Sequence, residues 1–290
     1  MKQPGKPAVN GNTLLMISSI YHSLTKAEKK VADIVQSNPQ EAVYYTVTDL
    51  AEKAAVGETS VIRFCRKLGY RGYHDFKLAM AQDVVQLPAG AAGGEPEESD
   101  DVLTVARKMT ESNTLMLQNT LNLLDPEAMR QAVRAITEAR KLYIYGVGSS
   151  GITAMDAHYR LMRIGIDVEV QRDAHIIAMS AALVKKGDAV LGISTSGSTK
   201  DLVDPIQRCK ENGATVICLT SHARSPITGY ADHILLIPAR EKPTEGGSLS
   251  TKIVQIHMLD MLCKMVEFAK KDEARQAIKK TAEAVADKLY

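Results

Sequence analysis

DAVLGISTSGSTK, residues 188–200, contains the most informative stretch of this chain. Its first half is a short apolar run, which predicts a buried strand, and residues 201–211 (DLVDPIQRCKE) have the pattern of a helix. Between the two lie hydroxyl side chains and a glycine. The N–H groups at the start of a helix attract anions, and hydroxyl groups donate hydrogen bonds without adding charge. The stretch therefore predicts a pocket for a phosphate group.

A second loop of the same kind lies upstream in residues 142–151 (LYIYGVGSSG), where an apolar run again leads into glycines, serines and a helical pattern. A pair of glycines after a strand is also typical of a tight turn without a ligand. A serine cluster is usually a flexible linker. The linker interpretation is disfavoured for residues 194–199, because another strand pattern, residues 214–220 (ATVICLT), follows the helix.

Strand and helix patterns alternate through the second half of the chain, which predicts an α/β fold with a five-stranded parallel sheet and helices on both faces. The predicted strands are residues 142–145, 168–171, 189–194, 215–220 and 233–237, and the helices between them are residues 152–163, 175–184 and 201–211. Two helices, 102–124 and 126–139, precede this region. A long helix, 251–269, is predicted as the last element, with Ile253, Ile256, Leu259, Leu262, Cys263 and Val266 on its apolar side.

Composition places the chain among globular proteins, with 290 residues, 45% hydrophobic residues and a net charge of +2. A charge so close to zero means that any contact with DNA must come from a local basic patch. The four cysteines have no metal-site spacing and lie in apolar patterns, so we expect reduced thiols in the core. No apolar run approaches 18 residues and no signal peptide is recognised, so we expect a cytoplasmic protein without a membrane partner.

Residues 87–101 are rich in glycine, proline, alanine and acidic residues, a composition typical of an exposed linker. We therefore predict a helical domain in residues 1–86 and an α/β domain in residues 102–290. In the helical domain, residues 25–36 (TKAEKKVADIVQ) begin with a threonine followed three residues later by a glutamate. This pattern predicts a capping box.

Residues 47–68 (VTDLAEKAAVGETSVIRFCRKL) have the layout of a helix-turn-helix, in which the second helix enters the major groove of DNA. Ala55 stands where this motif usually has glycine, and Gly57 stands where a capping serine is expected. An all-helical interaction or dimerisation module is the alternative. The residues predicted to contact DNA on the outward side are Glu58, Thr59, Ser60, Arg63, Arg66 and Lys67, with Arg71 and Lys77 on the phosphate backbone.

Motifs in both halves resemble one family. In the first half these are Leu24-Thr25-x-x-Glu28-x-x-x-Ala32, Val61-Ile62-Arg63-Phe64-Cys65-Arg66-Lys67-Leu68-Gly69 and Gly72-Tyr73-x-x-Phe76-Lys77. In the second half they are Gly146-x-Gly148-x-Ser150, Asp173-Ala174-His175 and Ser194-x-Ser196-Gly197-x-Thr199. The chain resembles the RpiR-type bacterial transcriptional regulators, which join a helix-turn-helix domain to a sugar-isomerase (SIS) domain.

The resemblance implies a five-stranded parallel sheet that binds a phosphosugar and usually dimerises. It also implies that Ser149, Ser150, Ser194, Ser196, Ser198 and Thr199 are phosphate ligands, and the residue patterns single out the same hydroxyls. The complete predicted phosphosugar site is Gly148, Ser149, Ser150, Asp173, His175, Ser194, Thr195, Ser196, Gly197, Ser198 and Thr199.

An enzyme is the principal alternative, because SIS folds also serve sugar-phosphate isomerases and lyases. An aldose–ketose isomerase needs an acid and a base beside the sugar. The candidates are Asp173, His175, Glu245 and His257, but Asp173 could simply cap a helix, and the sequence pairs none of them. We therefore predict a DNA-binding regulator of sugar or amino-sugar metabolism genes. It would bind a double-stranded operator as a homodimer or homotetramer and sense a phosphosugar, with no catalytic residue, metal or cofactor.

Overall fold

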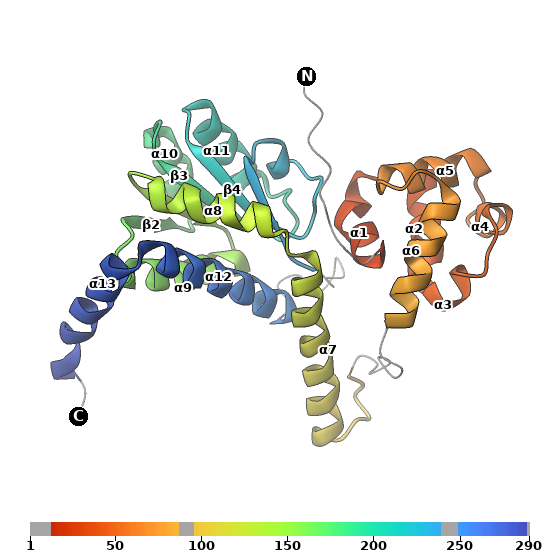
Figure 1. Ribbon diagram of the computed structural model, residues 1–290, viewed down its shortest axis with the longest axis horizontal. Helices are drawn as coiled ribbons and strands as arrows, with labels where there is room; N and C mark the ends of the chain where they lie inside the picture. Colours follow the sequence, from red (N-terminus) through yellow and green to blue (C-terminus); the bar gives the residue numbers. More distant parts are fainter. Residues whose placement is uncertain (1–12, 87–95, 239–248, 289–290) are drawn as a thin grey trace. The chain divides into compact units, whose positions relative to one another are not determined.

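The computed structural model describes residues 13–86, 96–238 and 249–288. The chain divides into two compact units, residues 1–123 and residues 124–290, which are treated separately below (Figure 1). The predicted linker, residues 87–101, lies partly outside the described residues. The helix at residues 102–123, which the sequence predicts as the beginning of the second domain, falls in the first unit.

The first unit contains helices and no strand in its described residues. The helices are α1 (Thr13–Ile20), α2 (Lys26–Ser37), α3 (Pro39–Ala42), α4 (Val47–Lys53), α5 (Glu58–Lys67), α6 (Tyr73–Gln86) and α7 (Val102–Leu123). Val31, Leu50, Phe64 and Phe76 are fully buried between them, and the rings of Phe64 and Phe76 meet edge to face at 5.8 Å. The apolar positions of several short helices therefore share one core.

The capping box predicted at the start of α2 is confirmed. The Thr25 hydroxyl accepts a hydrogen bond from the backbone N–H of Glu28, and the Glu28 carboxylate accepts one from the backbone N–H of Thr25. These bonds satisfy N–H groups that have no acceptor inside the helix, which fixes where α2 begins.

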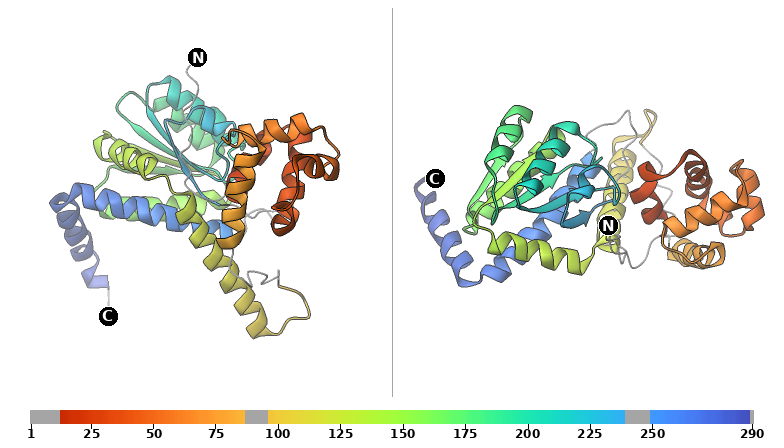
Figure 2. Two further views of the ribbon diagram at one scale, coloured as in Figure 1. Left: turned by 45° about the vertical axis from the view of Figure 1, so that its right-hand side comes forward. Right: turned by 90° about the horizontal axis from the view of Figure 1, so that it is seen from above.

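The second unit is built on a parallel five-stranded sheet with the order β2-β1-β3-β4-β5, and the prediction of five parallel strands is confirmed (Figure 2). Its strands are β1 (Leu142–Gly146), β2 (Val168–Gln171), β3 (Ala189–Ile193), β4 (Thr215–Thr220) and β5 (His233–Leu236). Helices α8 (Pro126–Glu138), α9 (Ser149–Arg163) and α12 (Leu249–Lys270) lie on one face of the sheet, and α10 (Ala174–Leu183) and α11 (Lys200–Glu211) on the other. β1 and β3 are buried along their whole length, which explains their continuous apolar sequences.

The prediction that the helix at residues 251–269 is the last element is wrong. A further helix, α13 (Asp272–Glu283), follows α12 after Lys271, whose φ of 48° breaks the helical path. The predicted apolar side of α12 is also rotated, because Val254, Gln255 and Met258 are buried while Ile253 and Ile256 are only half-buried. The sequence of α12 is apolar around most of its circumference, so it does not mark one face clearly.

All four cysteines are free and buried, as predicted. Burial raises the pKa of each thiol, Cys65, Cys209, Cys218 and Cys263, to about 12. These thiols therefore stay protonated near neutral pH and act as small apolar side chains. Along the described ranges, no helix combines the length and apolar character needed to cross a bilayer.

Candidate phosphate site and candidate nucleic-acid interface

The sheet order brings the two predicted phosphate loops together. β1 and β3 are neighbours and run in the same direction, and their last paired residues are Gly146 and Ile193. The chain leaves β1 towards β2 and leaves β3 towards β4, on opposite sides, so a crevice opens beyond their carboxyl ends. A cavity of about 150 Å³ lies there. It is lined by Val147, Ser149, Ser150, Ile193, Ser194, Thr195, Ser196, Thr199 and Leu202.

Two helices begin at this cavity. α9 starts at Ser149, after Gly148 with a φ of 61°, and α11 starts at Lys200, after Thr199. Neither Gly148 nor the side chain of Thr199 makes a capping hydrogen bond. The first N–H groups of a helix lack acceptors within it, and the helix dipole adds positive potential at that end. Both helix starts therefore favour an anion in the cavity.

The loop after β3 is held in shape by its own hydrogen bonds. The Ser194 hydroxyl accepts from the N–H of Gly197 at 3.1 Å, and the carbonyl of Thr195 accepts from the N–H and hydroxyl of Ser221 at 3.0 and 2.6 Å. Gly197 has a φ of 62°, in the left-handed region. A Cβ at this position would collide with the Ser225 side chain, so the turn requires glycine on two grounds. These contacts fix the shape of the cavity wall.

Sequence reasoning missed Gln255 of α12, which is 1% exposed and joins the two loops. Its amide nitrogen lies 3.2 Å from Ser150 Oγ and 3.0 Å from Thr195 Oγ1, and its amide oxygen accepts from Thr153 Oγ1 at 2.9 Å. The only signal in the sequence was a single amide within the apolar run of α12.

Five of the predicted ligand residues do not line the cavity. Asp173 is the N-cap of α10, where one carboxylate oxygen accepts from the N–H groups of His175 and Ile176 at 3.0 Å each. His175 is exposed on the first turn of α10. Ser198 is also exposed, and its hydroxyl donates to the carbonyl of Ser196. Gly148 and Gly197 shape the two turns rather than lining the cavity.

The described lining of the cavity carries no group that could serve as the acid or base of an isomerase. None of its described lining residues carries a carboxyl, imidazole or amino group. His257 is half-buried on α12 and is not among the lining residues, and Glu245 lies outside the described residues. The described part of the site can hold an anion through hydroxyl and N–H groups, but it offers no proton donor and acceptor of the kind that moves a proton beside a carbonyl.

α4 and α5 form the predicted helix-turn-helix. The two helices pack against each other, and Leu50 and Ala51 of α4 and Val61 and Phe64 of α5 are all buried. The turn departs from the usual pattern as predicted, because Ala55 takes a left-handed φ of 49° and Gly57 is an N-cap without a side chain. An alanine in this conformation costs about 1 kcal/mol, which a packed domain tolerates.

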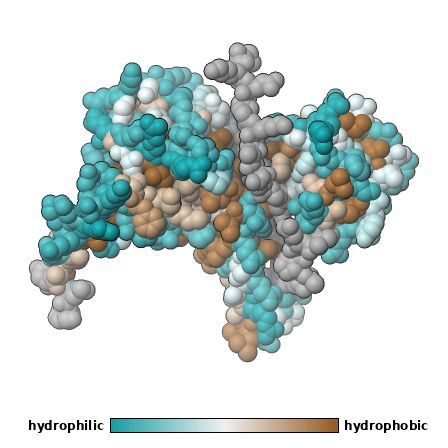
Figure 3. All heavy atoms as spheres, in the orientation of Figure 1, coloured by the Kyte–Doolittle hydropathy of each residue, from teal (hydrophilic) through white to brown (hydrophobic). Residues whose placement is uncertain are grey.

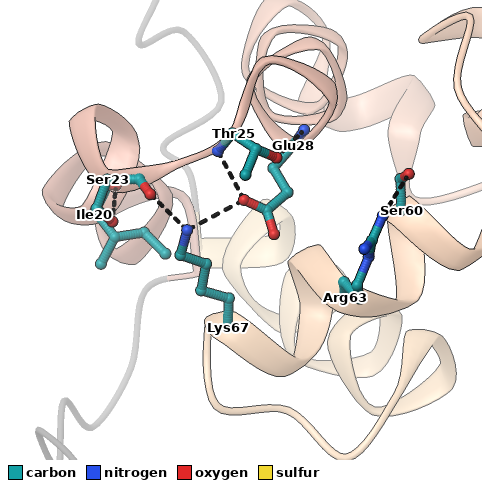
Figure 4. Close-up of polar contacts among 7 residues, drawn as sticks. All are labelled: Ile20, Ser23, Thr25, Glu28, Ser60, Arg63 and Lys67. Atoms are coloured by element: carbon teal, nitrogen blue, oxygen red, sulfur yellow. Dashed lines mark hydrogen bonds and ion pairs between the residues drawn. The ribbon is translucent and has the colours of Figure 1, made fainter.

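The outward side of α5 carries polar and basic side chains. Thr59, Arg63 and Arg66 are exposed, and Ser60 is half-exposed beside Arg63, whose guanidinium group lies 3.4 Å from the Ser60 hydroxyl (Figure 4). The side chain of Arg71, beyond the end of α5, is 92% exposed. Arginine can donate two parallel hydrogen bonds to guanine, so this side suits the major groove.

Comparison with known proteins agrees with both halves of this geometry. Residues 11–86 match the helix-turn-helix domain of the rpiR family, and residues 135–265 match the SIS domain. An uncharacterised HTH-type transcriptional regulator of Haemophilus influenzae is 36% identical over 96% of this chain and 98% of its own length. The chain belongs to the rpiR family of transcriptional regulators. HexR of Pseudomonas aeruginosa, another HTH-type regulator, is 33% identical over 96% of this chain and 97% of its own.

Among solved structures, this rpiR-family regulator is similar to the Vibrio vulnificus NanR protein, which was solved in complex with ManNAc-6P. The two share 29% identity and a TM-score of 0.62, over 96% of this chain and 99% of NanR. The SIS domain of an RpiR transcription factor from Sphaerobacter thermophilus has the same fold as the second unit, at 24% identity and a TM-score of 0.57, over 62% of this chain and 98% of its own.

Lys67, one of the predicted DNA contacts of this regulator, bonds within the first unit. Lys67 does not lie on the outward side of α5, because its ammonium group donates to the carbonyl of Ser23 and to the Glu28 carboxylate at 3.1 Å (Figure 4). Burial raises the pKa of Glu28, but hydrogen bonds from Thr25 and Lys67 outweigh it and hold the pKa below its ordinary value of 4.5. The carboxylate is therefore charged near neutral pH, and Lys67 supplies its counter-charge.

Two further side chains of the predicted interface form internal hydrogen bonds. The Lys77 ammonium group donates to the carbonyl of Tyr45 at 2.8 Å, and the Glu58 carboxylate accepts from the Thr48 hydroxyl at 2.7 Å. These bonds tie α6 to the start of α4 and tie α4 to α5. Both residues thus help to fix the helix-turn-helix itself.

Proposed function

We propose that this regulator binds an operator through α4 and α5, and that the cavity between its two loops senses a phosphosugar. The observation that carries the proposal is the convergence of two helix N-termini and several hydroxyl groups on a cavity without carboxylates among its described lining residues. Such a site is complementary to a phosphate group. The similarity to NanR, whose structure holds ManNAc-6P, supports a phosphosugar as the class of ligand.

On the DNA side, we propose that Arg63, Arg66, Thr59 and Ser60 face base edges or phosphates and that Arg71 holds the backbone. These side chains lie on or beyond the outward face of α5. Lys67 and Lys77 are left out because their ammonium groups bond within the unit. The regulated genes would serve sugar or amino-sugar metabolism in the cytoplasm, where the operator and the phosphosugar meet.

The two activities would be coupled by linkage. A phosphosugar changes operator affinity only if it binds the DNA-bound and the free protein with different affinity, and the operator then changes phosphosugar affinity by the same factor. The turn at Gly197 and the shared hydrogen bonds of Gln255 hold the two loops in one arrangement. The binding energy of the phosphosugar is therefore available to shift the equilibrium between the DNA-bound and the free protein, and little of it is needed to order the loops.

A panel of phosphosugars tests this proposal directly. Full-length protein is melted with ManNAc-6P, glucose 6-phosphate, fructose 6-phosphate and glucosamine 6-phosphate, each paired with its unphosphorylated sugar. A ligand at 100 times its Kd stabilises the folded protein by about 2.7 kcal/mol, so a true ligand raises the melting temperature clearly. We expect at least one phosphosugar to do so while its parent sugar does not. Equal shifts with the parent sugar would contradict a phosphate site.

We propose that the cavity acts as a sensor and does not turn over its ligand, because no acid or base is found among its described lining residues. Incubation of the stabilising phosphosugar with purified protein, followed by carbon NMR, should show no interconversion above buffer. Turnover that disappears in His257→Ala or Glu245→Ala would instead favour an isomerase or lyase.

We propose that the regulator is a homodimer, in which two helix-turn-helix units read two half-sites. Ile152, Met155, Tyr159 and Met162 are exposed on α9 at spacings of three and four residues, which places them on one face. The start of α7 in the first unit is also apolar, with Val102 and Leu103 84% and 75% exposed (Figure 3). Exposed apolar patches of this kind are typical of protein interfaces.

Replacing both Met155 and Tyr159 by glutamate should shift the protein towards monomers, because two charges would have to be buried in the contact. Light scattering after size-exclusion chromatography measures the mass directly. Arg130→Glu on the exposed side of α8 is the control and should leave the mass unchanged. A double variant that keeps the parent's oligomeric mass would exclude this face of α9 as the dimer contact.

A further inference from the structure

Gln255 holds an unusual position, because it bonds to both phosphate loops without lining the cavity between them. Its side-chain nitrogen is within hydrogen-bond distance of Ser150 in the first loop and Thr195 in the second, at 3.2 and 3.0 Å. Both hydroxyl residues line the cavity, whereas Gln255 does not. The glutamine is almost completely buried in α12, where apolar residues surround it in sequence. A buried amide at such a position needs its hydrogen bonds, and all three of these go to hydroxyl groups.

The chemistry of an amide decides the direction of these bonds. An amide nitrogen carries two hydrogens and only donates, so Ser150 Oγ and Thr195 Oγ1 must both accept. The amide oxygen faces Thr153, whose hydroxyl lies within donating distance both of this oxygen, at 2.9 Å, and of the Ser150 carbonyl, at 3.0 Å. A hydroxyl that accepts from Gln255 keeps its own hydrogen for another partner. For Ser150 and Thr195, that hydrogen is available to a ligand in the cavity.

We propose that Gln255 is a positioning residue that presents Ser150 and Thr195 to the cavity as hydrogen-bond donors. A site made of such donors, together with the N–H groups of two helix starts, prefers a tetrahedral oxyanion that is fully deprotonated and only accepts hydrogen bonds. Gln255 thus helps the cavity to distinguish a phosphate group from a sugar hydroxyl without touching either. The inference rests on the proposed function, because it assumes that the cavity binds phosphate.

The test is a double-mutant cycle with inorganic phosphate as the probe, titrated against full-length protein and followed by calorimetry. Gln255→Leu removes both N–H donors and frees the two hydroxyls to rotate. We expect phosphate affinity to fall about tenfold or more, the size of effect seen for hydrogen bonds to charged oxygen. Thr153→Val removes the partner of the amide oxygen without changing side-chain shape, and it should weaken binding by a smaller factor.

The decisive measurement is the phosphate affinity of the double variant that carries both Gln255→Leu and Thr153→Val. If Thr153 acts through Gln255, Thr153→Val has no further effect on phosphate affinity in the Gln255→Leu background. Gln207→Leu on α11, whose amide bonds to Glu211 away from the cavity, is the matched control and should bind phosphate like the parent. Melting of each variant without phosphate checks that it is folded.

The possible outcomes distinguish a failure of the role given to Gln255 from a failure of the proposed phosphate site. Parent protein that binds phosphate while Gln255→Leu binds it equally well overturns the role of Gln255 and leaves the phosphate site standing. Additive effects of the two substitutions likewise overturn it, because Thr153 would then act on Ser150 directly. Parent protein that binds no phosphate overturns both this inference and the proposed function. If Gln255→Leu fails to fold, Thr153→Val with parent-like phosphate affinity still contradicts the inference.

Discussion

Gly197→Ala is expected to abolish phosphosugar binding. The residue has a φ of 62°, where an alanine costs about 1 kcal/mol, and its new Cβ would overlap the side chain of Ser225 and lie 3.1 Å from Thr220 Oγ1. The loop must open to relieve this overlap, which displaces Ser194 and Thr195 from the cavity wall. Losing two hydrogen bonds to charged oxygen corresponds to about 3–6 kcal/mol, so we expect affinity to fall at least about 100-fold by calorimetry.

A second glycine provides the control for this experiment. Gly187 lies in the turn before β3, at the opposite end of the strand from the cavity, and has a φ of 90°. No atom lies within 4 Å of the point that a Cβ would occupy there, so Gly187→Ala carries a similar conformational strain without a collision. It should lower the melting temperature and leave phosphosugar affinity unchanged. Normal binding by Gly197→Ala would mean that the loop after β3 is not part of the site.

Arg63→Ala should weaken operator binding by about 1–3 kcal/mol, or roughly five- to 150-fold, if its guanidinium group contacts a base. Arg63 is exposed on the outward side of α5 and makes no ion pair among those found in the described residues, so the substitution removes little from the fold. Fluorescence anisotropy at fixed salt, with the operator and with an unrelated duplex, separates loss of specificity from loss of charge. Equal losses on both duplexes would show that Arg63 contacts phosphate rather than a base.

Lys67→Ala, in contrast to Arg63→Ala, should lower the stability of the protein and not its operator affinity. It leaves the carboxylate of Glu28 without its counter-charge, so the first unit should melt at a lower temperature. Operator affinity at a temperature where the variant is folded should stay close to that of the parent. A large loss of operator affinity in folded Lys67→Ala would show instead that Lys67 contacts DNA.

Most of the fold of the second unit could be predicted from the sequence, because its signals are local. β1, β3 and β4 are short apolar runs bounded by turns, the pattern of parallel strands buried on both faces. β2 (VEVQ) alternates instead and is half-buried. β2 and β4 were predicted with their observed bounds, and the other three strands end within one residue of the prediction. The placement of both loops at one edge of the sheet followed as well, since parallel strands have all their carboxyl ends there. Their close approach depends on β1 and β3 being neighbours, which the sequence did not predict.

What could not be predicted depends on contacts between residues far apart in the chain. Lys67 lies at a spacing from Arg63 that suits the outward face, and only the position of Glu28 on another helix draws it inward. Gln255 is separated by 105 residues from Ser150 and by 60 from Thr195, so nothing in its local sequence marks it as part of the site. α13 was missed because most of its residues are polar or charged and its apolar side consists mainly of alanines, of which only Ala274 is buried.

Coupling between the phosphosugar cavity and the helix-turn-helix can be measured as operator affinity with and without phosphosugar. Full-length protein first selects its binding site from genomic DNA fragments, and the operator is then titrated by anisotropy with the stabilising phosphosugar absent or saturating. We expect the phosphosugar to change the operator Kd by about five- to 150-fold, the usual range of coupling between two sites. In Gly197→Ala the phosphosugar should leave the operator Kd unchanged. For the parent protein, an operator Kd that is the same with and without saturating phosphosugar would contradict the proposed coupling.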